Sequence, residues 1–92
     1  MVIHEQGDGL VRMLKNPNLS MKTKGLLAYL SRCPEFVPIS YPYIAEDMSD
    51  GIAAIRAAAH EAEREGYLRR EQRMTVGKDG GRFGEAVWYV RI

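Results

Sequence analysis

The longest regular pattern of apolar positions in the N-terminal half follows Ser20 and predicts a helix. Apolar side chains recur there at three- and four-residue spacing, as they do on one face of a helix. They are Met21, Leu26, Leu27, Ala28 and Leu30. Ser20 can cap the first turn, and Pro34 prevents continuation. We therefore expect a helix over residues 20–32.

A second, shorter helix is expected over residues 40–48. Ser40 can cap its start, and Tyr41 and Pro42 follow in the first turn. Proline is tolerated there because its missing N–H is one that a helix start leaves unpaired.

A third helix is expected over residues 51–65, with Asp50 as its cap and Gly66 as its terminator. At 100° per residue, one side of this helix is apolar and predicts the face that packs in the core. That side carries Ile52, Ile55, Ala59 and Ala62. The connection from the second helix is very short, so the pair is expected to pack at a steep angle, as in a helix-turn-helix.

Two runs rich in β-branched and aromatic residues end the chain, at residues 67–76 and 83–92. The GKDGG between them is a strong turn signal, so they predict a β-hairpin. The apolar patch at residues 10–14 predicts a short N-terminal strand. We therefore expect one α+β domain over residues 1–92, with three helices followed by a hairpin. This is the order of elements in a winged helix-turn-helix, whose wing begins at residue 67.

Four segments resemble bacterial and phage winged helix-turn-helix domains of the replication-initiator or replisome-organiser type. They are residues 19–30 (LSMKTKGLLAYL), 44–45 (IA), 54–58 (AIRAA) and 65–68 (EGYL). The resemblance implies binding of double-stranded DNA, in replication initiation or transcriptional regulation of a phage or mobile element, or recruitment of replication proteins. Ala62 stands where such domains usually place leucine, which predicts a thin core under the third helix.

A second arc of the third helix predicts a surface that reads DNA. It carries Ala53, Arg56, Ala57, His60 and Arg64. Alanines let a helix lie close in a major groove, where arginine can donate two hydrogen bonds to guanine. Arg56, nearest the helix start, is the best candidate for a base contact.

A solvated helix face is the alternative interpretation of this arc. Alanine is the best helix former, and the two arginines could simply pair with Glu61, Glu63 and Glu65. Glu46, Asp47 and Asp50 lie just ahead of the helix and would repel phosphate if they faced DNA.

The hairpin is the second candidate DNA surface. Residues 67–92 carry six Lys or Arg against three Asp or Glu. Strand alternation sends Arg69 and Arg73 to one face and Arg70 to the other, while Lys78 and Arg82 lie at the tip. Such cations suit phosphates or a minor groove, although edge strands also carry charge simply to prevent aggregation.

Weaker DNA-contact candidates lie on the first two helices, namely Lys22, Lys24, Tyr41 and Tyr43. Tyr41 and Tyr43 could equally pack against the first helix. Of Trp88 and Tyr89 on the last strand, one is expected to pack under the third helix.

Composition limits the remaining possibilities. The chain has 92 residues, 46% of them apolar, and a net charge of +1. Its single cysteine, Cys33, allows no internal disulfide and fits a reducing compartment. The start lacks the pattern of a signal peptide, and no run approaches the roughly 18 apolar residues that span a bilayer. We therefore expect a cytoplasmic protein.

No enzymatic activity, metal, cofactor or small-molecule ligand is expected. His4 and His60 lie far apart in sequence, and Cys33 has no second ligand at metal-binding spacing. The expected partner is double-stranded DNA, with a second copy or a larger replication or regulatory protein as a further partner. The alternative is a protein-interaction or dimerisation module that uses the alanine face of the third helix or the patch at residues 10–14.

Overall fold

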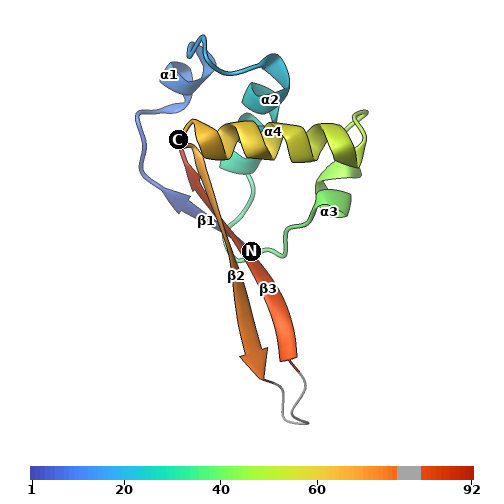
Figure 1. The fold of residues 1–92 in the computed structure, drawn as a ribbon. Coiled ribbons are helices and arrows are strands. Elements are labelled where there is room, and N and C mark those ends of the chain that lie inside the picture. The colour runs from blue at the N-terminus through green and yellow to red at the C-terminus, as the bar shows by residue number, and fades with distance from the viewer. Residues whose placement is uncertain (77–81) are drawn as a thin grey trace.

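The first strand and the last two strands form one sheet, although most of the chain lies between them. The computed structural model describes residues 1–76 and 82–92 and confirms the α+β class (Figure 1). Within these residues the elements are β1 (Val2–Glu5), α1 (Leu10–Leu14), α2 (Met21–Ser31), α3 (Tyr41–Ala45), α4 (Ile52–Arg64), β2 (Leu68–Val76) and β3 (Arg82–Arg91).

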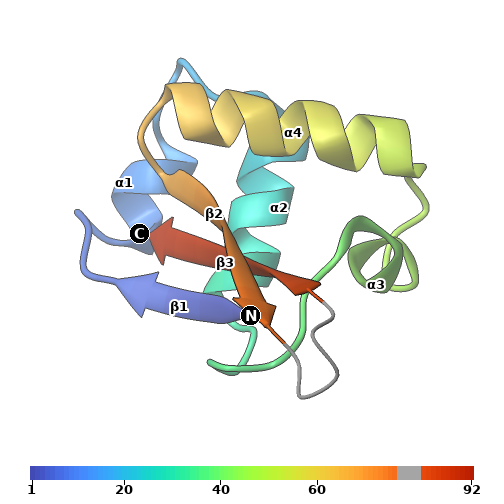
Figure 2. The same ribbon diagram turned by 60° about the horizontal axis from the view of Figure 1, so that its bottom comes forward.

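The sheet has the strand order β1-β3-β2, with β1 parallel and β2 antiparallel to β3. Val2 pairs with Trp88, and Leu68 pairs with Val90. All four side chains are buried in one cluster with residues of the helices. The helices therefore cover one face of the sheet, while the β2–β3 hairpin extends beyond them (Figures 1 and 2).

The start of α2 is confirmed and is capped twice. The Ser20 hydroxyl accepts a hydrogen bond from the Thr23 N–H at 3.2 Å. Glu61, from α4, accepts one from the Ser20 N–H at 2.6 Å. A carboxylate from another helix thus takes the place that a glutamate at the third helical position has in a capping box.

Helix α3 is shorter than expected. Ser40 does cap it, accepting from the Tyr43 N–H at 3.2 Å. The helix ends at Ala45 rather than near residue 48, because Asp47 and Met48 donate to carbonyls three residues back instead of four. These tighter bonds turn the chain toward α4.

Helix α4 begins at Ile52 with Gly51 at the N-cap position, so the prediction of an Asp50 cap is wrong. Its end is as expected. Gly66 adopts a φ of 83°, and the Tyr67 N–H donates to the Ala62 carbonyl at 3.0 Å. Together with the bond from Gly66 N–H to the Glu63 carbonyl, this closes a Schellman motif.

The buried face of α4 carries little side-chain volume. It consists of Ile55 and three alanines, Ala58, Ala59 and Ala62, so the thin core predicted from Ala62 is present. Ile52 was expected on this face but is 39% exposed, because it is the first residue of the helix. Ala58 takes its place.

Residues 10–14 are a helix rather than the predicted strand. Met13 is fully buried, whereas Val11 is 64% and Leu14 is 42% exposed. The edge position beside β3 is occupied by Val2–Glu5, so a strand at residues 10–14 has no partner there. Five apolar-rich residues cannot by pattern alone be assigned to helix or strand.

Within the described residues, none of the helices combines the length and the apolar character needed to cross a membrane.

Candidate nucleic-acid interface

The outer face of α4 is open to solvent along its whole length. All five residues of the predicted DNA-reading arc are exposed: Ala53, Arg56, Ala57, His60 and Arg64. The arc combines two arginines and a histidine with two alanines, so methyl groups separate the longer side chains. A surface of this form can approach a groove closely.

Arg56 lies beside the start of α3. Its guanidinium carbon is 5.3 Å from the centroid of the Tyr41 ring, within the range of a cation–π contact. The same ring meets Trp88 edge to face, with centroids 5.7 Å apart. The Tyr41 side chain thus lies between α3 and the sheet and contacts both Arg56 and Trp88. Tyr43, by contrast, is 41% exposed.

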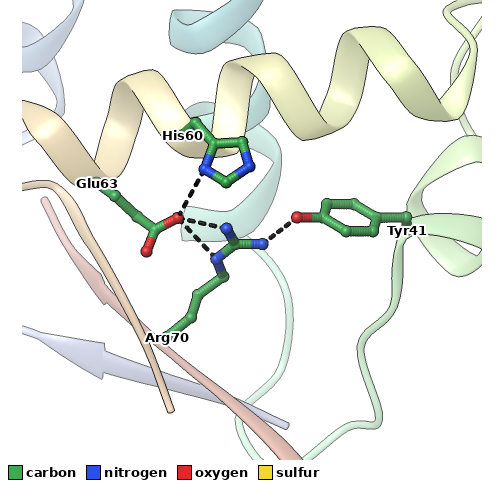
Figure 3. Close-up of polar contacts among 4 residues, drawn as sticks. All are labelled: Tyr41, His60, Glu63 and Arg70. Atoms are coloured by element: carbon green, nitrogen blue, oxygen red, sulfur yellow. Dashed lines mark hydrogen bonds and ion pairs between the residues drawn. The ribbon is translucent and has the colours of Figure 1, made fainter. Parts of the chain in front are cut away.

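Arg70 has a structural partner on every side of its guanidinium. Its Nε donates to Glu63 Oε1 at 2.9 Å, its Nη2 donates to the same oxygen, and its Nη1 donates to the Tyr41 hydroxyl (Figure 3). The guanidinium carbon also lies 5.3 Å from the Trp88 ring centroid. Partial burial lowers the Arg70 pKa, but the hydrogen bonds with Glu63 and Tyr41 outweigh burial and raise it. This cation ties β2 to α4 and α3.

Glu63 is the common acceptor of this cluster. Besides Arg70, it meets His60, whose Nδ1 lies 3.7 Å from Glu63 Oε1 (Figure 3). The carboxylate therefore points toward the hairpin and balances Arg70.

Two further acids that could have repelled phosphate are engaged elsewhere. Glu61 faces α2, and the hydrogen bond from the Ser20 N–H holds its pKa below the usual range. Asp47 accepts a hydrogen bond from the Tyr29 hydroxyl at 2.8 Å. Burial, helped by this bond, raises the Tyr29 pKa. Glu46, Asp50 and Glu65 remain exposed.

Arg69 lies on the opposite face of the sheet from Arg70, as strand alternation predicts. Its guanidinium carbon stacks 3.9 Å from the Tyr89 ring centroid. Its amino groups meet Glu71 and, at 3.8 Å, Glu5. Trp88, by contrast, is buried in the core under the helices, so of the two aromatic residues it is the core member.

The other predicted hairpin cations are known only by position. Arg73 pairs with Glu85 and Arg82 with Val76 in the β2–β3 ladder, and the description does not extend to the side chains of these four residues. Lys78 lies outside the described residues.

The two lysines of α2 differ in exposure. Lys22 is exposed at the rim of an apolar groove of about 290 Å³ between α2 and α4, whereas Lys24 is half-buried. Met21, which is 89% exposed, and Asp50 also line this groove.

In the part of the chain that the structure describes, no group of three His, Cys, Asp or Glu residues could hold a metal. His4 Nε2 meets the Cys33 carbonyl oxygen at 2.6 Å rather than the Cys33 sulfur. Burial raises the Cys33 pKa, and its thiol donates to the Tyr29 carbonyl.

The Arg70 cluster was missed by sequence reasoning, which placed Arg70 among the DNA-contacting cations. One signal was available. Arg70 lies two residues after Leu68 on β2, so the two side chains share a face, and a leucine two residues after the helix-ending Gly66 predicts a core-facing position. Arg70 therefore shares the helix-covered face of the sheet.

Comparisons with known proteins give no relative from which a function could be transferred. No protein-family model matches the chain, and no curated protein or solved structure is significantly similar to it.

Proposed function

We propose that this chain is a winged helix-turn-helix module that binds double-stranded DNA through α4 and the β2–β3 hairpin. The observation that carries the proposal is the exposed arc of α4. Arg56, His60 and Arg64 are exposed there in a row. Of the glutamates on α4, Glu61 bonds to the start of α2, and Glu63 bonds to Arg70 of β2 besides lying 3.7 Å from His60. The net charge of only +1 thus understates the positive character of this face.

In this proposal α4 lies in the major groove. Arg56, held beside Tyr41, donates to a guanine edge, and Ala53 and Ala57 allow the helix backbone to approach the bases. His60 and Arg64 contact bases or phosphates further along the helix. The setting is replication initiation or transcriptional regulation of a phage or mobile element.

The hairpin supplies backbone contacts. Among the described residues its exposed cations are Arg69 and Arg91, and phosphate contacts of this kind position a protein without specifying sequence. Arg70 contributes indirectly, because its bonds to Glu63 and Tyr41 fix the angle between the hairpin and α4.

The test is a fluorescence-anisotropy titration of the chain against a random duplex pool at two salt concentrations. A DNA-binding surface loses affinity with salt by a log–log slope of about 0.9 per neutralised phosphate. Arg12→Ala is a matched control, because Arg12 is an exposed helical arginine on α1, away from α4. Absence of binding at low salt, or an equal loss with Arg12→Ala and Arg56→Ala, contradicts the proposal.

A protein-interaction module is the second candidate, favoured by one observation. Val11 and Leu14 on α1 are large apolar side chains that the fold leaves 64% and 42% exposed. A chain of this second class would show no salt-dependent DNA binding in the titration, whereas a partner docked at α1 by apolar contact would respond weakly to salt.

A further inference from the structure

The two outer edges of the sheet differ in whether their backbone groups have hydrogen-bond partners. The outer edge of β1 is closed by the loop after α2: the His4 N–H donates to Glu35 Oε1 at 2.9 Å, and the Phe36 N–H donates to the Val2 carbonyl at 3.1 Å. Another strand could pair with residues 2–4 only by displacing these two bonds.

The outer edge of β2 is open. The Arg91 N–H donates to the Tyr67 carbonyl at 2.8 Å, which fixes the phase of the antiparallel ladder. Because hydrogen-bonded pairs alternate, residues 69 and 71 bond to β3, and Arg70 and Gln72 direct their N–H and C=O groups away from it. Among the described residues, no hydrogen bond to either outward pair of backbone groups is found.

We propose that a second copy of this chain pairs with β2 along this edge, antiparallel and centred on Gln72, to form a dimer with a continuous six-stranded sheet. At the centre, the two Gln72 residues exchange N–H···O=C bonds, and Leu68 of each copy pairs with Val76 of the other. The whole of β2 is thereby matched.

Strand length and charge together select this register. Centring on Arg70 would also set Glu71 opposite an arginine, Arg69, but would leave residues 73–76 without a strand partner. Outward groups pair only if the register shifts in steps that keep even-numbered residues opposite one another. Centring on Glu71 would set Glu71 against itself and position 69 against position 73, both arginine. Centring on Gln72 sets Glu71 opposite Arg73 twice, and opposite charges across a ladder are favourable whereas like charges are not. An edge protected only by charge of one sign would repel a second copy in either register.

The symmetry of such a pair also suits the fold. The two-fold axis of an antiparallel pair of identical strands is perpendicular to the sheet, so both sets of helices lie on the same face. The contact is isologous and closes at two copies. It does not depend on DNA, so the dimer and the proposed function can fail separately.

The experiment is sedimentation equilibrium of the full chain without DNA, over a concentration series. The wild-type chain is expected to dimerise reversibly. Gln72→Pro removes the outward N–H but no bond to β3, and proline is tolerated at strand edges. Because both central bonds are lost, its dimer dissociation constant should rise at least about tenfold. Gln72→Ala keeps the N–H and should dimerise like the wild type.

A charge-reversal set keeps the test valid if the proline variant unfolds. Glu71→Arg should weaken the dimer, and the double exchange Glu71→Arg with Arg73→Glu should restore it. Arg69→Ala loses the same intrachain Arg69–Glu71 contact as Glu71→Arg but should leave the dimer intact. Circular dichroism verifies that each variant is folded. A wild type that stays monomeric throughout, or a dimer equally insensitive to Glu71→Arg and to Gln72→Pro, overturns the proposal.

Discussion

Two basic regions of this small protein use their charges in opposite ways. On the outer arc of α4, Arg56 and Arg64 are exposed. At the base of the hairpin, Arg70 is surrounded by Glu63, Tyr41 and Trp88. The two regions share Glu63, which stands on α4 but balances the cation of β2. A count of charges along α4 therefore misjudges its outer face, because part of the negative charge belongs to another element.

The largest expected effect is on DNA binding and comes from α4. Arg56→Ala should weaken binding to a preferred site by roughly 1 to 3 kcal/mol and relax the preference at one base pair. Its thermal stability should change little, because Arg56 is exposed and its described contact is with the Tyr41 ring. Anisotropy titrations on a selected site and on single-base variants measure both quantities. Uniform weakening on all sequences would make Arg56 a phosphate contact instead.

Arg70→Ala should have the opposite profile. It removes two hydrogen bonds to a carboxylate and leaves Glu63 without its cation, so urea unfolding should show a loss of roughly 1 to 2 kcal/mol. Arg70→Lys keeps the charge but not the fork that reaches Glu63 and Tyr41 together, and should recover only part of this stability. If Arg70→Ala unfolds at the same urea concentration as the wild type and only DNA binding falls, Arg70 is a DNA-contacting cation rather than a structural one.

Ser20→Ala tests the helix cap that lies beside the Glu61 contact. The serine hydroxyl caps α2, and its N–H holds Glu61 away from the arc of α4. Loss of the cap should cost about 1 kcal/mol in urea unfolding, whereas Ser20→Thr, which retains an acceptor, should cost much less. Equal losses in the two variants would show that the cap bond is not the source of the effect.

The smallest expected effect is the pH dependence of the Glu61 contact. The Glu61 pKa is lowered in the folded chain by the Ser20 N–H, so its contribution is complete above the unfolded-state pKa and disappears as the pH falls through the folded-state pKa. Glu61→Gln should therefore be less stable than the wild type at neutral pH and approach it in the acidic range. A difference that is constant with pH would assign the effect to packing.

Local signals in the sequence predicted most of the helical part of the fold. Ser20, Ser40 and Gly66 act within a few residues of themselves, and the helices they bound were found close to the expected positions. The hairpin was predicted for the same reason, since its two strands are adjacent in sequence.

Long-range pairing explains what was missed. Strand β1 pairs with β3 across almost the whole chain, and no local feature of Val2–Glu5 indicates that partner. Without it, residues 10–14 were the more apolar candidate for a strand. The Arg70–Tyr41 contact likewise joins residues 29 positions apart. The exposed arc of α4, by contrast, follows from helical periodicity alone and was predicted residue by residue.

The most direct measurement is the change in backbone amide chemical shifts when a short DNA duplex is added to the isotopically labelled chain at low salt. We expect the largest changes at the exposed positions of α4, from Ala53 to Arg64, with smaller ones at Arg69 and none on α1. Changes confined to α1, or to the groove beside Met21, or no changes at all, would contradict the claim that the outer arc of α4 is the DNA-binding surface.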